Sequence, residues 1–320
     1  MGQRLVSIHR SRELAIEASA PRARRIKRPT PERPLILSAS ELRDFLRCRV
    51  RWAWRHQLGI VPRKKPVPLT FGGLGHQILA AWYALPERER TVKRMRRIAK
   101  RILGATNPED LDVKDLELLE AMCVGYAEWA KPRDEAIGLE KLQPERWFEL
   151  PLTKDGSIRV RGAIDATFRV RSLRRTVGCF EHKFKSQIRI DAIDLNLQLS
   201  VYLWALRQLY PGAKRYIAYY NVLRKQMPGP RVRADLFARE SVERTDEEID
   251  QWAIDTERIA LDMLDAAIYP NPMDNCSWDC DYQVPCMLRG RPDDMAVVFQ
   301  RDFKDKDTDT GENLNVYYYE

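Results

Sequence analysis

The 320-residue chain lacks the apolar runs that membrane segments and export signals require. It contains no stretch of about 18 consecutive apolar residues, so we expect no membrane-spanning helix. Its basic N-terminus has no apolar core of a secretory signal, which favours a cytoplasmic protein. Internal repeats and a GxxxxGK[ST] phosphate loop are also missing, so any ATP-driven motor has to be another chain.

Cysteine is scarce, and its placement is informative. Only six cysteines occur, and a chain of this length can build its core without disulfides. Three of them fall within positions 276–286, which is typical of a metal or cluster site in a reducing compartment. We interpret Cys123 and Cys179 as small core residues.

Basic residues exceed acidic residues, 55 to 46, giving a net charge of +9. This surplus favours an anionic partner such as nucleic acid. Residues 1–34 hold nine Lys or Arg and three acids, which predicts either a mobile basic arm or a solvated leader. Residues 291–320, with eight acids and four bases, are predicted to be a loosely held acidic tail.

Residues 35–290 carry the periodic patterns of an ordered domain. Ser38 and Glu41 have the spacing of a helix capping box, and a second helix is predicted to open at Gly72. Residues 86–145 are interpreted as a helical insertion. Its basic run 88–101 fits either a nucleic-acid-facing helix or an ordinary solvated face.

From Trp147 the apolar period changes from that of a helix to that of a strand. Strands are predicted at 158–170, 176–185 and 214–223. The intervening helix, roughly 191–210, is apolar nearly all round and is therefore expected to be buried; another amphipathic helix follows Asp246. These elements predict an α/β fold with a mixed, largely antiparallel sheet.

Two of these strands carry carboxylates that are predicted to meet. If Val170 pairs with Thr176, Asp165 lies opposite Glu181, with Cβ atoms ~5 Å apart. Two like charges at that distance need a cation between them, which is either Mg²⁺ or Mn²⁺ or the side chain of Lys183. An exposed hairpin with cross-strand charges fits the same residues.

Three polar residues on predicted helices add to this site. His76 lies about 170° from the apolar stripe of its helix, so it faces either solvent or a site. Gln198 and Tyr202 are four residues apart and share one edge of an otherwise apolar helix. A phosphate, a base edge or a neighbouring backbone would satisfy their hydrogen bonds.

Four motifs in order, Gly72-x-x-x-His76, Gly162-x-x-Asp165, Glu181-x-Lys183 and Gln198-x-x-x-Tyr202, resemble the PD-(D/E)XK nuclease superfamily, specifically its RecB-like branch, over Leu35 to Cys286. The resemblance implies a restriction-endonuclease-like core with a mixed central sheet flanked by helices. It also implies that His76, Asp165 and Glu181 bind the metal, that Lys183 assists the attacking water, and that Gln198 and Tyr202 contact substrate. Ile164 stands where the superfamily name has Pro.

The resemblance implies a Mg²⁺- or Mn²⁺-dependent DNA exonuclease acting on single-stranded ends. Recombination, CRISPR adaptation and phage DNA metabolism are the settings it suggests, in the cytoplasm of a prokaryotic cell or a phage-infected host. Two alternatives remain: a non-catalytic nucleic-acid-binding module, and a subunit that is active only with a protein partner in a helicase or adaptation complex.

The clustered cysteines Cys276, Cys280 and Cys286, in the region 271–290, need a fourth ligand to close a site. Cys48 is the best fourth, because it lies about 140° from its helix stripe. One N-terminal and three C-terminal cysteines resemble the iron staple of RecB-like nucleases, which implies a 4Fe-4S cluster. The spacing of three residues between Cys276 and Cys280, instead of two, keeps zinc as an alternative.

Substrate contacts are predicted from charge and aromatic content. Three tryptophans, Trp52, Trp54 and Trp82, either stack unpaired bases or pack in the core. The basic residues expected to follow a phosphate backbone are Arg159, Arg161, Arg169, Lys185 and Arg189.

Overall fold

The computed structural model describes residues 26–64, 67–107, 110–227, 229 and 236–305. Residues 1–25 of the predicted basic arm and residues 306–320 of the predicted tail lie outside the described residues. Within 26–34 of the arm, Ile26 is buried and its backbone N–H donates to the Leu264 carbonyl at 3.1 Å. The chain forms two compact units. Residues 1–64, 151–161 and 253–320 make the first unit, and residues 65–150 and 162–252 make the second.

The sheet is mixed, as predicted. Strands β4 and β5 are antiparallel, β5 and β6 are parallel, and β6 and β7 are antiparallel. In the first unit, β1 runs parallel to the opening residues of β4. The strand order is β1-β4-β5-β6-β7, with β3 also paired to β4. The bounds are β1 (Leu35–Ser38), β3 (Leu139–Pro151), β4 (Ile158–Val170), β5 (Thr176–Lys185), β6 (Arg215–Arg224) and β7 (Phe237–Glu243).

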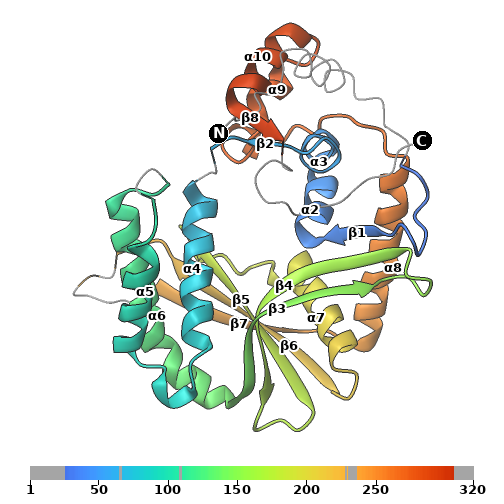
Figure 1. Ribbon diagram of the computed structural model, residues 1–320. Coiled ribbons are helices and arrows are strands. Elements are labelled where there is room, and N and C mark those ends of the chain that lie inside the picture. Colours follow the sequence, from blue (N-terminus) through green and yellow to red (C-terminus); the bar gives the residue numbers. More distant parts are fainter. Residues whose placement is uncertain (1–25, 65–66, 108–109, 228, 230–235, 306–320) are drawn as a thin grey trace. The chain divides into compact units, whose positions relative to one another are not determined.

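Helices cover both faces of the sheet in the second unit (Figure 1). Helices α4 (Val67–Tyr83), α5 (Val92–Leu103) and α6 (Val113–Ile137) lie side by side against one face, where Phe168 and Phe180 join their buried core. Helix α7 (Leu197–Leu209) covers the other face. It begins at Asn196, whose side chain accepts backbone N–H bonds of the first helical turn.

Strand β3 corrects the predicted helical insertion. Residues 86–145 were expected to be helical, but α6 ends at Ile137, and β3 begins at Leu139. Gly138 takes a left-handed conformation, φ 71°, which ends a helix readily. The next residues are mostly polar and show little alternation, so their pairing with β4 is invisible in the sequence pattern.

The first unit combines short helices with short strands. Ser38 caps α2 (Ala39–Arg47) by accepting the Glu41 backbone N–H at 3.2 Å. The Glu41 side chain is buried and accepts a hydrogen bond from the indole of Trp52. The remaining elements are α3 (Arg49–Trp52), β2 (Ile60–Pro62), the larger part of α8 (Asp246–Leu264), α9 (Gln283–Met287), α10 (Pro292–Asp302) and β8 (Phe303–Asp305).

The prediction of a loosely held tail is wrong for residues 292–302, which form helix α10. Met295, Val298 and Phe299 form its apolar stripe, and all three are buried in a cluster with Trp54 and Tyr282. The high content of acidic residues masked this stripe, because Asp293 and Asp294 lie in the first helical turn, where negative charge is favourable. Strand β8 follows and pairs with β2.

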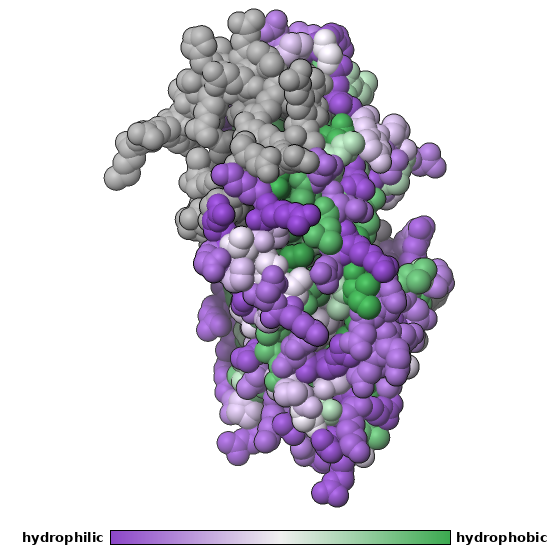
Figure 2. Space-filling view, turned by 90° about the vertical axis from the view of Figure 1, so that its right-hand side faces the viewer, coloured by the Kyte–Doolittle hydropathy of each residue, from purple (hydrophilic) through white to green (hydrophobic). Residues whose placement is uncertain are grey.

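Hydrophilic residues dominate the face that carries α8, with smaller apolar groups between them (Figure 2). Ile254 and Leu261 are apolar residues of α8 that remain about half exposed. None of the helices in the described part of the chain combines the length and the apolarity needed to cross a membrane.

Candidate active site

The two carboxylates meet through the predicted strand register. Strands β4 and β5 pair from Ala166 with Phe180 to Arg169 with Val177, which is the register predicted from the sequence. In that register Asp165 comes opposite Glu181. The Oδ2 atom of Asp165 accepts the backbone N–H of His182 at 2.6 Å, so β5 itself holds this carboxylate in place.

A chain of hydrogen bonds runs from Glu181 to helix α7. The Lys183 ammonium forms an ion pair with Glu181 and donates to Oε1 of Gln198 at 2.9 Å. Gln198 donates to the Tyr202 hydroxyl at 2.8 Å, and that hydroxyl donates to the Ala163 carbonyl at 2.7 Å. The Gln198 and Tyr202 pair therefore orients Lys183 and ties α7 to the strand that carries Asp165.

Helix α4 supplies the imidazole of the site. The Nδ1 atom of His76 lies 3.1 Å from Oδ1 of Asp165, and the side chain is about one-third exposed. The ring of Phe184 packs edge-on against it, with centroids 5.7 Å apart. His76 therefore lies against the carboxylate of Asp165 and is not free in solvent.

The two carboxylates have opposite pKa shifts. Burial raises the pKa of Glu181, and the nearby charge of Asp165 raises it further, while Lys183 only partly offsets this. Burial also acts to raise the pKa of Asp165, but its contacts with His76 and His182 outweigh burial and lower it. Glu181 is therefore the carboxylate that gains most from an added positive charge.

The pKa values of His76 and Lys183 are shifted upward, which favours their charged forms. Burial would lower the pKa of His76, but the hydrogen bond and charge of Asp165 outweigh it, so the pKa is raised. The pKa of Lys183 is likewise raised, because Glu181 outweighs the cost of burial. Burial, with the charges of Glu181 and Asp165, raises the pKa of Tyr202 well above its usual value, so Tyr202 stays a neutral donor.

His182 is a site residue that sequence reasoning missed. Its ring lies on the opposite strand face from Glu181 and stacks on Tyr83 at 5.7 Å and 16°. Burial lowers the pKa of His182 to about 3, so the ring is neutral near pH 7. In the sequence, only its position between Glu181 and Lys183 could have pointed to His182 as a site residue. Its stacking on Tyr83 depends on how the helices pack and leaves no local sequence pattern.

A buried polar network lies behind His182. The Tyr83 hydroxyl donates to Asp134 at 3.1 Å and lies 3.0 Å from the Tyr126 hydroxyl. Arg239 of β7 donates to Asp134 at 2.8 Å and to Tyr126 at 3.2 Å. These contacts join α4, α6 and β7 behind the strand that carries Glu181, and the sequence patterns did not reveal them.

The donor set suits a hard divalent cation. Carboxylate oxygens with one imidazole are ligands that Mg²⁺ and Mn²⁺ accept, and two buried like charges favour a cation beside them. In the described residues, no three His, Cys, Asp or Glu side chains are arranged to hold a metal ion. His76 and Lys183 contact the carboxylates instead. By chemistry, Asp165, Glu181 and His76 are the residues that would hold the ion.

Comparison with protein families decides the class of this site. The family model of the PD-(D/E)XK nuclease superfamily matches residues 36–287. The chain belongs to this superfamily. Its members are nucleases, hydrolases of nucleic-acid phosphodiester bonds, so the substrate of this PD-(D/E)XK protein is nucleic acid.

Other comparisons add little to this assignment. No curated protein matches the chain. Among solved structures, the PD-(D/E)XK protein is similar to "Putative exonuclease" from Eubacterium rectale, with 13% sequence identity and a TM-score of 0.44. That match covers 87% of this chain and 94% of the other.

The four clustered cysteines of this PD-(D/E)XK protein lie in its first unit. Burial raises the pKa of Cys280 and Cys286, and the nearby thiols of Cys48 and Cys276 add to both shifts. Cys48 packs against the same buried apolar cluster as Cys280 and Cys286. Among the described residues, no three of these thiols are arranged to hold a metal ion, so the 4Fe-4S cluster stays a prediction.

The loop between Cys276 and Cys280 is held by two arginines. Arg47 donates to the Asp279 carboxylate at 2.8 Å, and Arg51 donates to the Asp279 carbonyl at 2.9 Å. The three-residue spacing between Cys276 and Cys280 thus contains Asp279, which anchors the loop to these arginines.

Burial settles the interpretation of three tryptophans and two cysteines. Trp52, Trp54 and Trp82 are fully buried, so the interpretation as core packing is confirmed. Cys123 and Cys179 are fully buried core residues, also as predicted.

Proposed function

We propose that the protein hydrolyses DNA phosphodiester bonds with Mg²⁺ or Mn²⁺, as an exonuclease on single-stranded ends. The observation that carries this proposal is the convergence of His76, Asp165, Glu181 and Lys183 on one end of the β4–β5 pair. A purely structural set of cross-strand charges would not place a histidine from another element against the acid pair.

Each residue has a role that its surroundings support. Asp165, Glu181 and His76 would hold the divalent ion, which when bound would polarise the phosphodiester and lower the pKa of a bound water. Lys183, kept cationic by Glu181, stabilises the negative charge that develops on the phosphate. Gln198 and Tyr202 position Lys183 through their hydrogen bonds.

The narrower parts of the proposal have separate support. The order of the four motifs favours the RecB-like branch and thereby exonuclease action in recombination, CRISPR adaptation or phage DNA metabolism. The net charge of +9 suits a phosphate backbone, and no recognition-helix or zinc-finger pattern for reading bases occurs in the sequence. Activity that depends on a protein partner is compatible with the same site.

Labelled oligonucleotides test the proposal. Single-stranded DNA carrying a label at the 5′ or the 3′ end is incubated with the protein in Mg²⁺, Mn²⁺ or EDTA, beside a closed circular single strand. We expect release of mononucleotides or short fragments from one end with metal, and no cleavage of the circle. Cleavage of the circle would contradict exonuclease action.

The matched control is Asp165→Ala, purified in the same way. We expect its cleavage rate to fall by at least about a thousandfold, because it removes an acid from the metal site. Equal degradation by the variant and the wild type would reject this site as the nuclease centre.

We also infer that Cys48, Cys276, Cys280 and Cys286 hold a 4Fe-4S cluster that joins distant parts of the chain. The packing of Cys48, Cys280 and Cys286 against one apolar cluster is compatible with it. Protein purified without oxygen should be brown, absorb near ~400 nm and contain iron and sulfide. A colourless protein with one zinc per chain would replace the cluster with the zinc alternative.

A further inference from the structure

Two lysines lie at the end of the strand pair that carries Lys183. Strands β5 and β6 are parallel, and their last paired residues are Lys185 and Arg224. The backbone N–H of Lys225 donates to the Lys185 carbonyl at 2.7 Å, which extends the pairing by one residue. Lys185 and Lys225 are therefore fixed to each other by the backbone just beyond the candidate active site.

Aromatic rings, and not carboxylates, support the two ammonium groups. The Nζ atom of Lys185 lies over the Tyr220 ring, 5.2 Å from its centroid. The Nζ atom of Lys225 lies over the Phe71 ring, 4.3 Å from its centroid. A ring attracts a cation without neutralising it, so the positive charge remains available to another anion.

An acidic partner would neutralise the charge of either lysine. Among the described residues, neither Lys185 nor Lys225 forms an ion pair. Asp115, at the start of α6, is the acid that acts on Lys225 through space. Lys225 is half-buried, and burial lowers its pKa, so this charge lacks full compensation.

The position of the pair relates it to the acid site. Lys185 lies two residues after Lys183 and shares its strand face, ~7 Å further along β5. Phe71, below Lys225, packs on Phe184, which in turn packs on His76. Lys185 therefore follows Lys183 on one strand face, and on the other face Lys225 is linked to His76 through the rings of Phe71 and Phe184.

We propose that Lys185 and Lys225 form a clamp for the backbone phosphates of the single-stranded DNA next to the bond being cut. This proposal deepens the proposed function and rests on it. Two ammonium groups at one strand end suit the phosphates of a nucleic-acid strand, each of which carries one negative charge. They make no contact that reads a base, so the clamp accepts any sequence.

Fluorescence anisotropy with a labelled single-stranded oligonucleotide in EDTA tests the clamp without cleavage. We expect Lys185→Gln and Lys225→Gln each to raise the Kd roughly fivefold at low salt. Each variant should also flatten the slope of log Kd against log salt by about 0.7, because one phosphate contact is lost. The double variant should lose about 1.4 from the slope.

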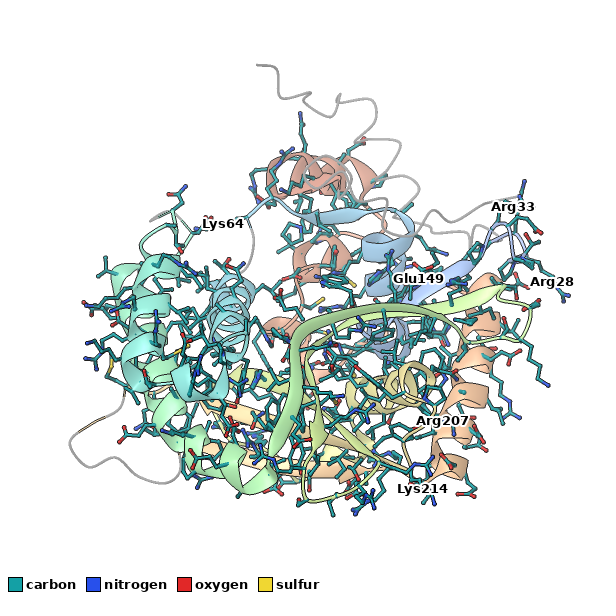
Figure 3. The ribbon with its side chains drawn as sticks, turned by 60° about the horizontal axis from the view of Figure 1, so that its bottom comes forward. Arg28, Arg33, Lys64, Glu149, Arg207 and Lys214 are labelled. Carbon is teal, nitrogen blue, oxygen red and sulfur yellow. The ribbon has the colours of Figure 1, made fainter. Side chains whose placement is uncertain are left out.

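Lys214→Gln is the matched control, because Lys214 is an exposed lysine at the opposite end of the same strand pair, just before β6 (Figure 3). We expect its Kd and slope to equal those of the wild type. Lys185→Arg and Lys225→Arg keep the charge and should restore binding, and thermal melting of every variant checks that it is folded.

Three outcomes overturn the clamp: unchanged salt slopes in both Gln variants, equal losses in Lys214→Gln, or failure of the Arg variants to restore binding. In each of these cases, a wild-type protein that still cleaves DNA with Mg²⁺ leaves the proposed function intact. A wild-type protein that neither binds nor cleaves the oligonucleotide rejects both proposals.

Discussion

Lys183 links the acidic strand of the candidate site to helix α7. It contacts Glu181 on its own strand and Gln198 on α7. Sequence reasoning assigned Gln198 and Tyr202 to substrate contact, whereas their hydrogen bonds in the structure are to Lys183 and to the Ala163 carbonyl. A substrate phosphate would have to share or replace these bonds.

Lys183→Ala is predicted to lower kcat about 100- to 1000-fold with little change in KM, because the ammonium acts on charge that develops during the reaction. Steady-state cleavage of a labelled oligonucleotide measures both constants. Gln198→Ala should lower kcat less, since it removes only the support of Lys183. A rise in KM alone would show instead that Lys183 serves ground-state binding.

Asp44 in the first unit provides a test of pH dependence. Burial alone would raise the pKa of Asp44, whereas its hydrogen bond with His56 lowers it. The charges of Arg51 and Arg55 act in the same direction and bring the pKa to about 2. Its carboxylate is therefore more acidic in the folded state than in the unfolded chain, where the pKa is about 3.9.

A lowered folded-state pKa stabilises the protein above the unfolded pKa, and this stability is lost as the pH falls through the folded pKa. Between pH 5 and pH 2 we therefore expect the free energy of unfolding of the wild type to fall by roughly 2 kcal/mol more than that of Asp44→Asn. Urea unfolding at each pH measures the difference. Parallel curves for the two proteins would show that Asp44 is not the titrating group.

At the scale of elements, the packing of α4 on β5 positions His76. Helix α4 begins at Val67 and not at the predicted Gly72, so the glycines lie inside the helix. A Cβ atom on Gly75 would overlap the Phe184 ring, which packs against His76. A Cβ atom on Gly72 would meet nothing within 4 Å. Close approach of helix and strand therefore requires glycine at one of these positions only.

Gly75→Ala is predicted to destabilise the protein by about 1–3 kcal/mol and to lower cleavage, because the displaced Phe184 ring disturbs His76. Gly72→Ala is the matched control and should stabilise by up to about 1 kcal/mol, since alanine favours a helix interior. Thermal or urea unfolding with a cleavage assay measures both effects. Equal behaviour of the two variants would contradict close packing at Gly75.

At the scale of the whole molecule, the cysteines join parts of the chain that are distant in sequence. Cys48 lies between α2 and α3, and the other three precede α10. Arg28 and Arg33 lie near the turn before β1, in the same unit (Figure 3). A cluster held by these thiols would restrict the unfolded chain across a loop of more than 200 residues.

Cys48→Ser is predicted to lose iron and to expose residues 253–305 to protease, because one ligand of the proposed cluster is removed. Cys123→Ser is the control for a cysteine outside the cluster and should keep its full iron content. Iron analysis and limited proteolysis followed by mass spectrometry read out the change. Full metal content in Cys48→Ser would remove this cysteine from the ligand set.

The sequence by itself determined the features that depend on local periodicity. Alternation along 158–170 predicts that strand, and the loop 171–175 places Val170 opposite Thr176, which is the register that the structure has. The meeting of Asp165 with Glu181 follows from this register. The start of β3, helix α10 and the true bounds of α4 have weak local patterns and were missed.

Only the tertiary structure decided which side chains from other elements complete the site. His76, the support of Lys183 by α7 and the stacking of His182 on Tyr83 depend on how helices pack across the sheet. The same holds for the rings beneath Lys185 and Lys225. These contacts join residues separated by tens to more than a hundred positions, and no short-range pattern encodes them because they arise only when both faces of the sheet are covered.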